Sequence, residues 1–384
     1  MQSQRVALLL SDINAFRLIP GIHRFAGWGR DYWMVDITRP LEELKELLRR
    51  WEPAGIIVEW LPNVTEEIVS LGIPSVVTVG DVQNLNVPSL DVDDRRVGEL
   101  AAVHLLGLSL ESFAFIGEPT HYGRQREEAF RERILKEGYD CESLFRRPTI
   151  ARKYIEHWHE VRPELVQWLK NLPKPVGVFA AHDPMGRLVA ETCRLEGIRI
   201  PEEVAIIGAN NDPHICGLTY PPLSSIEIPW EDIGYETART MENCLRDPQQ
   251  LDLEPVLVSP TQVVPRRSSD FLSVSSPEVA KALEFIHENT NSRMSVNDVV
   301  RESGTSRRNL EREFRRIKDT TILGEITRVC IDRSKPLLRR MDMSIEQVAE
   351  VCGFGRHERF TTNFRKWEGC TPRDYRKRFR VSSE

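Results

Sequence analysis

The sequence lacks a long hydrophobic run. No segment contains eighteen consecutive apolar residues, which is about the length that a membrane-spanning helix requires. The polar start, Met1 to Arg5, leads straight into a strand-like run, which is not the pattern of a secretory signal peptide. We therefore expect a protein without a membrane partner and without a leader.

Cysteine is scarce and is not arranged in pairs. The seven cysteines are scattered from Cys141 to Cys370, and no C-x-x-C motif occurs. An odd number without regular spacing is typical of buried or incidental thiols in a reducing compartment. This pattern predicts a cytoplasmic protein.

The common catalytic motifs are also absent. The sequence has no G-x-S-x-G elbow, no Walker A loop and no H-E-x-x-H metal motif. His157 and His159 have an H-x-H spacing that metal sites sometimes use, but a third ligand is not identifiable nearby. His182 beside Asp183 could be a base with its carboxylate, yet neighbours at a strand end seldom face each other. We predict no enzyme activity, no metal and no cofactor.

Positive charge is scarce in most of the chain and concentrated at its end. From Pro277 onward there are 23 Lys and Arg against 17 Asp and Glu, a net charge of +6. The first 276 residues hold 29 against 41, a net charge of −12. A basic segment supplies the contacts that release counterions from nucleic acid, whereas the acidic part is unsuited to wrapping DNA.

The first 265 residues alternate apolar runs with helical periodicity, the pattern of parallel strands joined by crossover helices. Strands are expected at residues 6–10, 32–37, 55–58, 75–79, 113–117, 176–180, 204–208, 224–228 and 256–259. Helices are expected at residues 19–28, 41–50, 65–71, 94–106, 125–137, 163–169, 185–195 and 231–245. Pro20 would then lie in a first helical turn, where proline is tolerated. We predict an α/β fold with two parallel-sheet lobes whose strand ends open on a shared cleft.

A serine-rich segment separates this region from the basic one. Residues 266–276 contain five serines and precede Pro277, a composition typical of linkers. We therefore assign residues 1–265 to a two-lobed domain, residues 266–276 to a linker, and residues 277–384 to a second, all-α domain.

The second domain contains an internal repeat, at residues 295–318 and 344–368. Five positions recur at a shift of 49 before the glycine and 50 after it: Ser295, Val299, Gly304, Leu310 and Phe314 match Ser344, Val348, Gly353, Phe360 and Phe364. In each copy the serine and the residue three positions later can form a capping box, and the glycine can end the first helix in the left-handed conformation. The two apolar residues four apart place one face of the second helix in a core.

The other face of each second helix is basic. Its cations are Arg307, Arg308, Arg312, Arg315 and Arg316 in the first copy and Arg356, His357, Arg359, Arg365 and Lys366 in the second. One such hairpin is often only the solvated face of a helical bundle. Two in tandem favour a pair of helix-turn-helix motifs, in which the second helix enters the major groove of double-stranded DNA.

A family signature closes the repeat. It consists of Gly353-Phe354, a helix, and the run GCTPRDYR at residues 369–376. On these motifs residues 278–380 resemble the DNA-binding domain of AraC-type transcription regulators. Pro336 departs from the family pattern because it falls within residues 322–339, where the family has a long linking helix. Proline removes a backbone donor, so we expect it to kink or break that helix.

Three phrases in the first domain resemble a second family. They are REEAF at residues 126–130, VAIIGANN at residues 204–211 and YPPLSSI at residues 220–226. They are similar to the sugar-sensing core of LacI/GalR-type regulators and periplasmic sugar-binding proteins, over residues 4–265. The order and the junction of the two domains resemble those of the xylose operon regulators.

Sugars are bound by planar polar side chains, with an aromatic ring over one face. The candidates that follow predicted strands or open helices are Asp12, Asn14, Phe16, Asp81, Arg126, His182, Asp183, Asn210 and Asn211. The resemblance implies sugar contacts first for Arg126, Asp183 and Asn210, with Asp81 and Phe16 behind them. A buried arginine without an anion would need the acceptors that a polyol supplies. A helix cap or a turn is the alternative role of Asp12, Asn14 and Asn211.

The resemblance also divides the basic face into two kinds of contact. Groove-facing positions expected at base edges are Arg308, Glu311 and Arg312 in the first copy, and His357, Glu358, Arg359 and Thr362 in the second. Expected phosphate contacts are Arg307, Arg315, Arg316 and Lys366, and Arg356 is a further candidate DNA contact.

Together these features predict a sugar-responsive transcription activator. The expected effector is a monosaccharide, D-xylose by family likeness, and the other expected partners are a DNA operator, RNA polymerase and a second copy of the chain. We expect it in the cytoplasm, at the nucleoid. Two alternatives stay open, because the C-terminal helices could dock a protein and the sensor could bind a nucleoside or an amino acid.

Overall fold

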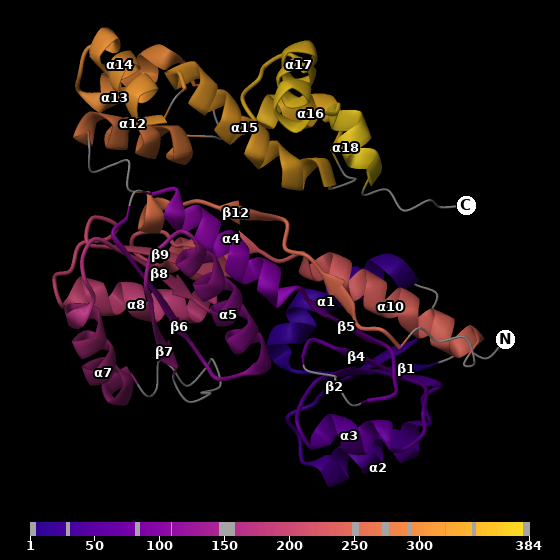
Figure 1. The fold of residues 1–384 in the computed structure, drawn as a ribbon. Helices are drawn as coiled ribbons and strands as arrows, with labels where there is room; N and C mark the ends of the chain where they lie inside the picture. The colour runs from indigo at the N-terminus through magenta and orange to yellow at the C-terminus, as the bar shows by residue number, and fades with distance from the viewer. Residues whose placement is uncertain are drawn as a thin grey trace. The chain divides into compact units, whose positions relative to one another are not determined.

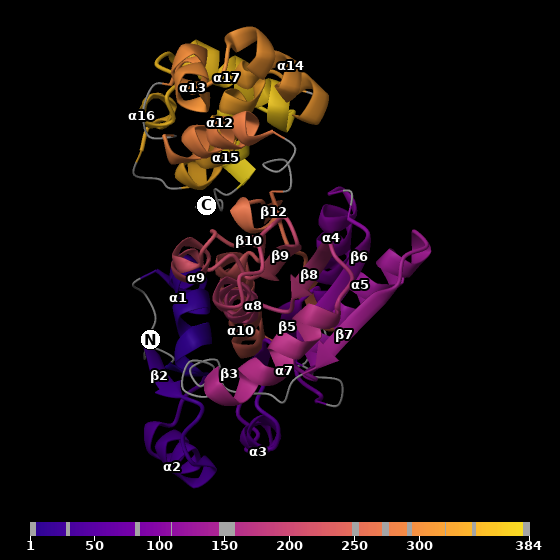
Figure 2. The ribbon, with the colours of Figure 1, turned by 90° about the vertical axis from the view of Figure 1, so that its left-hand side faces the viewer.

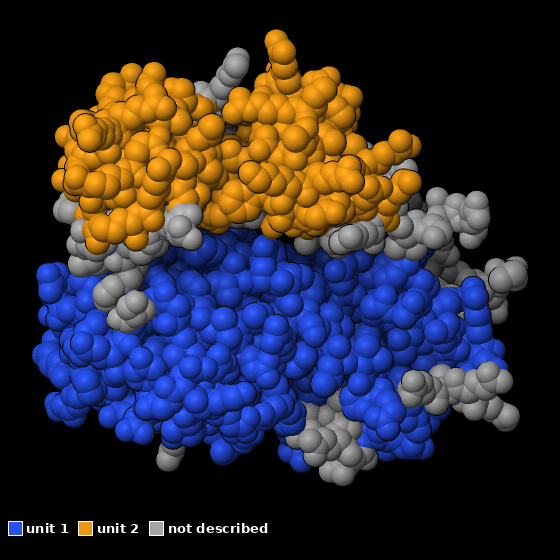
Figure 3. Space-filling model, turned by 45° about the horizontal axis from the view of Figure 1, so that its top comes forward, with its two compact units in different colours: residues 1–270 blue, residues 271–384 orange. Residues whose placement is uncertain are grey.

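The chain divides into two compact units, residues 1–270 and residues 271–384 (Figure 3). The computed structural model describes residues 5–27, 31–80, 85–108, 110–145, 158–247, 253–270, 276–289, 294–318, 320–339 and 343–378. Within these ranges no helix is both long and apolar enough to cross a membrane.

The first unit contains two six-stranded sheets, and the first sheet forms the first lobe. Its strand order is β11-β5-β4-β3-β1-β2, and all the paired strands run parallel. The strands are β1 Val6–Leu10, β2 Tyr32–Asp36, β3 Gly55–Glu59, β4 Ser75–Thr78, β5 Ser89–Val92 and β11 Val256–Val258. The helices of this lobe are α1 Asp12–Ala26, α2 Leu41–Trp51, α3 Val64–Val69 and α10 Trp230–Arg246. Figure 1 shows α1 and α10 on one face of the sheet and α2 and α3 on the other.

The second sheet forms the second lobe, in the order β12-β10-β9-β8-β6-β7. Its strands are β6 Ser112–Gly117, β7 Cys141–Phe145, β8 Val176–Ala180, β9 Val204–Ala209, β10 Ser224–Glu227 and the antiparallel β12 Gln262–Val264. Its helices are α4 Asp94–Leu106, α5 His121–Lys136, α7 Trp158–Asn171, α8 Asp183–Leu195 and α9 Pro213–Leu218. Helix α4 packs on α5 and α7 packs on α8, with the strands between these two layers (Figure 2). The predicted two parallel-sheet lobes are confirmed.

The chain passes between the lobes three times. It leaves the first lobe between β5 and α4, returns between β10 and α10, and leaves again between β11 and β12. Three short connections are the only covalent links between two separate cores within the described residues. Such an arrangement permits the lobes to move relative to each other.

The first helix begins earlier than the sequence predicted. Helix α1 starts at Asp12 because the Ser11 side chain accepts the Asn14 N–H, and Pro20 therefore lies inside the helix. The prediction that Pro20 occupies a first turn is wrong. Tight packing against α10 holds this helix, since a Cβ on Gly21 would come within 1.8 Å of the Glu231 carbonyl oxygen and one on Gly234 within 2.1 Å of the Leu18 carbonyl oxygen.

Three strands were missed, and one segment expected to be a linker is folded. Strands β5, β7 and β12 are short and lack a clear apolar run, so they are defined by pairing with neighbouring strands. The start of the predicted linker is a 3-10 turn, η1 Arg267–Ser269, in which Ser268 and Ser269 are buried. The Ser268 hydroxyl donates to the Ile206 carbonyl at 2.6 Å. Residues 271–275 of the linker lie outside the described part of the chain.

The second unit is helical in its described residues, and its core contains both copies of the repeat. The helices are α12 Pro277–Glu288, α13 Val296–Ser303, α14 Arg307–Lys318, α15 Ile322–Arg339, α16 Ile345–Val351, α17 His357–Glu368 and α18 Pro372–Arg378. Both predicted capping boxes form, and Gly304 and Gly353 have φ angles of 72° and 77°. The paired apolar residues of α14 and α17 are fully buried in one core.

The long helix α15 continues across position 336, so the prediction of a break at Pro336 is wrong. Proline has no N–H to donate and so removes one backbone hydrogen bond at this position, but the helix continues past it to Arg339. Buried Ile331 and Leu338 hold the helix on both sides of it in the core.

Candidate functional site

A buried ion pair lies at the start of the second lobe. Arg126 on α5 is 3% exposed, and its Nε donates to Asp94 Oδ1 at 2.6 Å. Its Nη1 donates to the Ala181 carbonyl beyond the end of β8, and the guanidinium lies 5.1 Å from the Tyr122 ring centroid. Arg126 therefore has an anionic partner, and the expectation of a buried arginine without one is wrong. Its partner, Asp94, is 32 positions away in the sequence, which is why the sequence did not reveal the pair.

Asp183 is fully buried at the first position of α8. Its Oδ1 accepts from the Ser225 hydroxyl at 2.5 Å, and its Oδ2 accepts from the Asp212 N–H at 2.8 Å. Gly208 makes room for it, since a Cβ there would lie 2.5 Å from Asp183 Oδ1. Burial raises the pKa of Asp183 to about 6. The Asp183 carboxylate thus links α8 to the ends of β9 and β10. Its oxygens can still accept further hydrogen bonds.

His182 caps the same helix. Its Nδ1 accepts the Met185 N–H at 3.2 Å, and its Nε2 lies 3.9 Å from Glu118 Oε2. Burial, reinforced by Arg126 and Arg17, lowers the pKa of His182 to about 3, so the ring is neutral at pH 7. His182 and Asp183 point to different partners, as expected of sequence neighbours.

The two asparagines after β9 form a left-handed turn. Asn210 and Asn211 have φ angles of 105° and 53°, a conformation that asparagine tolerates. The Asn211 side-chain oxygen accepts from Arg266 at 2.7 Å, a contact that agrees with the structural role given as its alternative. Asn210 is half-buried, and its backbone N–H donates to the Ile226 carbonyl.

In the first lobe, the candidate ligand-binding residues lie on α1, which is held to the end of β3 by hydrogen bonds. The Asn14 Nδ2 donates to Glu59 Oε1 at 2.7 Å, and the Ser11 N–H donates to Glu59 Oε2 at the same distance. Asn14 is therefore held by Glu59, while the Phe16 side chain is 84% exposed. Asp12 is exposed in the first turn of α1. Asp81 lies outside the described residues.

Arg17 is a cross-lobe residue that the sequence analysis missed. Its guanidinium lies 4.8 Å from the Trp230 ring centroid. Burial lowers its pKa, while Asp212 and Asp183 of the second lobe act to raise it. A residue of α1 thus faces the carboxylates of the other lobe. Its position directly after Phe16 was the only available signal in the sequence.

Arg17 of the first lobe thus interacts with the carboxylates of Asp183 and Asp212 and lies near Arg126 and His182 of the second lobe. Such groups can donate hydrogen bonds to the vicinal hydroxyls of a small polar ligand and accept hydrogen bonds from them. Among the described side chains, no three His, Cys, Asp or Glu residues are grouped as metal ligands. His159 lies in the first turn of α7, and His157 falls outside the described ranges.

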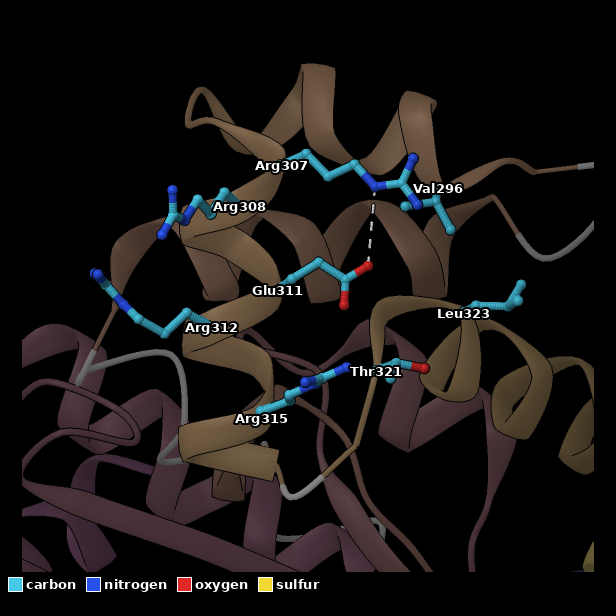
Figure 4. A pocket seen from close by; sticks show the side chains of 8 residues that line it. All are labelled: Val296, Arg307, Arg308, Glu311, Arg312, Arg315, Thr321 and Leu323. Carbon is cyan, nitrogen blue, oxygen red and sulfur yellow. Dashed lines mark ion pairs between the residues drawn. The ribbon is translucent and has the colours of Figure 1, made fainter.

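The second unit presents two similar hollows, one beside each recognition helix. The first has a volume of about 600 Å³ and is lined by Val296, Arg307, Arg308, Glu311, Arg312, Arg315, Thr321 and Leu323 (Figure 4). The second measures about 370 Å³ and is lined by Ile345, His357, Thr361, Thr371, Pro372 and Arg373. Several lining residues occupy equivalent positions in the two copies of the repeat. Val296, Arg307, Glu311 and Thr321 correspond to Ile345, His357, Thr361 and Thr371. The hollows are therefore the same feature of the motif, formed twice.

The exposed cations of α14 differ in how they are held. Arg307 lies 4.0 Å from Glu311, and Arg316 pairs with Glu313 at 2.6 Å. Arg312 donates to Asn309 Oδ1 at 2.6 Å and lies 3.4 Å from Glu313. In Figure 4 Arg308 and Arg312 point to one side of α14, while Arg307 and Arg315 point toward Val296 and Thr321. The recognition helix therefore presents arginines in two directions, as a helix in a DNA groove requires for bases and backbone.

Two family models match the chain. The periplasmic binding protein-like domain matches residues 102–269, and a helix-turn-helix domain matches residues 299–378. The first match covers the second lobe, and the second covers α14 to α17 with most of the flanking helices.

Curated relatives match nearly the whole length of the chain. The xylose operon regulatory protein of Haemophilus influenzae is 28% identical, over 98% of this chain and 98% of that protein. The protein of the same name from Escherichia coli K12 is 27% identical, over 97% and 96%. A solved structure of a xylose-binding transcription activator matches with a TM-score of 0.61 and 24% identity, covering 98% of each chain, and supports the fold. These relatives are regulators rather than enzymes. The chain therefore has a periplasmic binding protein-like domain followed by a helix-turn-helix domain, and over nearly its whole length it is similar to sugar-operon regulatory proteins.

Proposed function

We propose that this protein is a sugar-responsive activator of an operon for pentose catabolism, with D-xylose as its effector. The observation that carries the proposal is the match to two xylose operon regulatory proteins over both domains, in the same order and at nearly equal length. A sensor and a DNA-binding module in one chain link the concentration of a ligand to transcription. We place it in the cytoplasm, at the nucleoid, because its proposed partner is a DNA operator.

The proposed sugar contacts are Arg126, Asp183 and Asn210, with His182, Asn14, Asn211, Phe16 and Asp81 around them, and Arg17 is added from the structure. Asp94 compensates the charge of Arg126, so the site offers a neutral set of donors and acceptors there. At Arg126 a neutral hydroxyl is therefore favoured over a phosphate, because the charge of its guanidinium is already balanced. The exposed ring of Phe16 is free to cover the C–H face of a sugar.

The proposed DNA contacts are the exposed side chains of the two recognition helices. Base edges are met by Arg308, Glu311, Arg312, His357, Glu358, Arg359 and Thr362, and phosphates by Arg307, Arg315, Arg316, Arg356 and Lys366. The capping boxes and the buried aromatic pairs hold both helices in place. Arginine and glutamate at such positions hydrogen-bond guanine and cytosine respectively.

Sugar binding is proposed to act through closure of the lobes. The three connections between the lobes permit closure, and groups from both lobes meet at Arg17. Only a difference in sugar affinity between the open and closed forms can shift the DNA-binding equilibrium. We further propose that the chain works as a homodimer, because tethering weak helix-turn-helix units raises their joint affinity for repeated half-sites. RNA polymerase is the partner that an activator requires.

Thermal unfolding of the full chain against a panel of pentoses, hexoses, nucleosides and amino acids tests the effector. A ligand that binds the native state must raise the unfolding midpoint by mass action. We expect D-xylose to raise the midpoint more than hexoses do and nucleosides to have no effect. A shift with nucleosides alone would contradict the sugar assignment.

A further inference from the structure

The two helix-turn-helix units of the second domain are not chemically equivalent, although they share one scaffold. We call residues 295–318 the first head and residues 344–368 the second head. Each begins with a complete capping box and buries two apolar residues of its recognition helix. Since the structural positions agree, differences at exposed positions are not required by folding.

The recognition helices have the same length but different charge. Helix α14 has twelve residues, with six Lys and Arg against two Glu, a net charge of +4. Helix α17 also has twelve residues, with three Lys and Arg against two Glu, a net charge of +1. The first head therefore has a much stronger attraction for a polyanion.

The difference is concentrated on one stripe of the helix. Arg308, Arg312 and Arg315 are spaced four and three residues apart, so their Cα atoms share one face of α14, and all three are exposed, although the Arg315 side chain turns toward Thr321 (Figure 4). We call this the first stripe. The equivalent second stripe, fifty residues later, consists of Glu358, Thr362 and Arg365, all exposed as well.

Salt bridges do not remove this difference. Within the described part of the second unit, no carboxylate lies within ion-pair distance of Arg308 or Arg315, and no cation lies within that distance of Glu358. The hollow beside each recognition helix repeats the contrast. Four arginines line the first hollow, whereas His357 and Arg373 are the basic residues that line the second. Arg308, Arg315 and Glu358 are therefore available to an outside partner, whereas Arg312 also contacts Asn309 and Glu313.

We propose that the heads divide the work of DNA binding. This inference rests on the proposed function. The first head is the electrostatic anchor: its stripe binds a guanine-bearing subsite and provides most of the salt-dependent attraction. The second head discriminates, because Glu358 accepts a hydrogen bond from a cytosine amino group and is repelled by phosphates and by the acceptor edge of guanine. Each half-site thus contains two unlike subsites that the heads cannot exchange.

An exchange of the two stripes tests the division. In the full chain, one variant carries Arg308→Glu and Arg312→Thr, and the matched variant carries Glu358→Arg and Thr362→Arg. Binding to a duplex selected by the unaltered chain from a random library is measured as a function of salt. A cation in the groove offsets phosphate charge whether it hydrogen-bonds a base or a phosphate, so each cation removed or added changes the slope of log affinity against log salt by about 0.9. The exposed positions leave the fold intact, and the thermal midpoint checks this.

We expect the first variant to lower the magnitude of the salt slope by about 1 to 2 and to reduce the preference for guanine in one subsite by ~10-fold. The second variant should raise the slope by a similar amount and lose selection at the other subsite only. Equal effects of the two variants on both subsites, or no change of slope in either, would overturn the division. If the unaltered chain selects no duplex at all, the proposed function itself fails and the division with it.

Discussion

The two units carry their charged side chains in opposite ways. In the sensor unit, Arg126 and Asp183 are buried and hydrogen-bonded, within a sequence of net charge −12 over its first 276 residues. In the DNA-binding unit, Arg308 and Arg312 are exposed, and residues 277–384 have a net charge of +6. Buried charges need partners inside the protein, whereas exposed ones are available to partners outside it. Charges of the sensor are therefore held by contacts within it, whereas charges of the other unit are open to solvent.

Removal of a buried charge should have the largest effect. Arg126→Ala leaves Asp94 buried without its partner, so we expect the sensor to lose about 3–5 kcal/mol of unfolding free energy. Denaturant unfolding of the full chain measures it. Arg133→Ala, in the same helix but on the surface, is the control and should change little. A loss for Arg126→Ala as small as that of the control would show that the buried pair is not important for stability.

The close contact between α1 and α10 should respond to one methyl group. Gly21→Ala forces a Cβ against the Glu231 carbonyl, and overpacking of this kind costs about 1–3 kcal/mol. Gly217→Ala is the matched control, because nothing lies within 4 Å of a Cβ placed there. Unfolding midpoints of the two variants should separate clearly. Equal midpoints would mean that the helices can shift apart without cost.

Removal of an exposed arginine should alter binding but not folding. Arg312→Ala is expected to weaken specific DNA binding by ~1–3 kcal/mol and to relax sequence preference at one position. The control is Arg246→Ala in α10 of the sensor unit, an exposed arginine that should not affect DNA affinity. Competition with variant duplexes measures both quantities. A uniform loss across all sequences would assign Arg312 to phosphate.

The smallest expected effect is a difference between the two capping boxes in how their stability depends on pH. Hydrogen bonds from Ser295 hold the pKa of Asp298 below its ordinary value of 3.8, so this carboxylate stabilises the fold above that value and loses its contribution as the pH falls. Gln347, at the same place in the second box, does not titrate. Below about pH 4 the amides of α13 should therefore exchange faster relative to those of α16. Asp298→Gln should abolish this difference in exchange rate. If the difference persists in Asp298→Gln, the capping carboxylate is not its cause.

Local patterns in the sequence predicted the second unit better than the sensor site. Capping boxes, the left-handed glycines and the buried apolar pairs depend on residues within one or two turns, and all were found. The alternation of strands and helices predicted both lobes, but β5, β7 and β12 were missed because they depend on pairing. The break at Pro336 did not occur, since tertiary packing outweighed a local propensity.

The sensor site depended on contacts that are distant in sequence. The sequence singled out Arg126 and Asp183 as candidates but did not reveal the hydrogen-bond partners Asp94, Ser225 and Asp212, because folding brings them together from separate elements. Arg17 was missed for the same reason. The carboxylates that it faces, Asp183 and Asp212, lie in the other lobe, and no local pattern marks it.

Titration of a selected duplex with the full chain, with and without D-xylose and over a range of salt, tests the central claim most directly. A steep fall of affinity with salt is expected from an interface of exposed arginines, and a change of affinity with the sugar is expected from a coupled sensor. DNA affinity that is insensitive to D-xylose and to every other sugar tested, or that is flat with salt, would contradict the account.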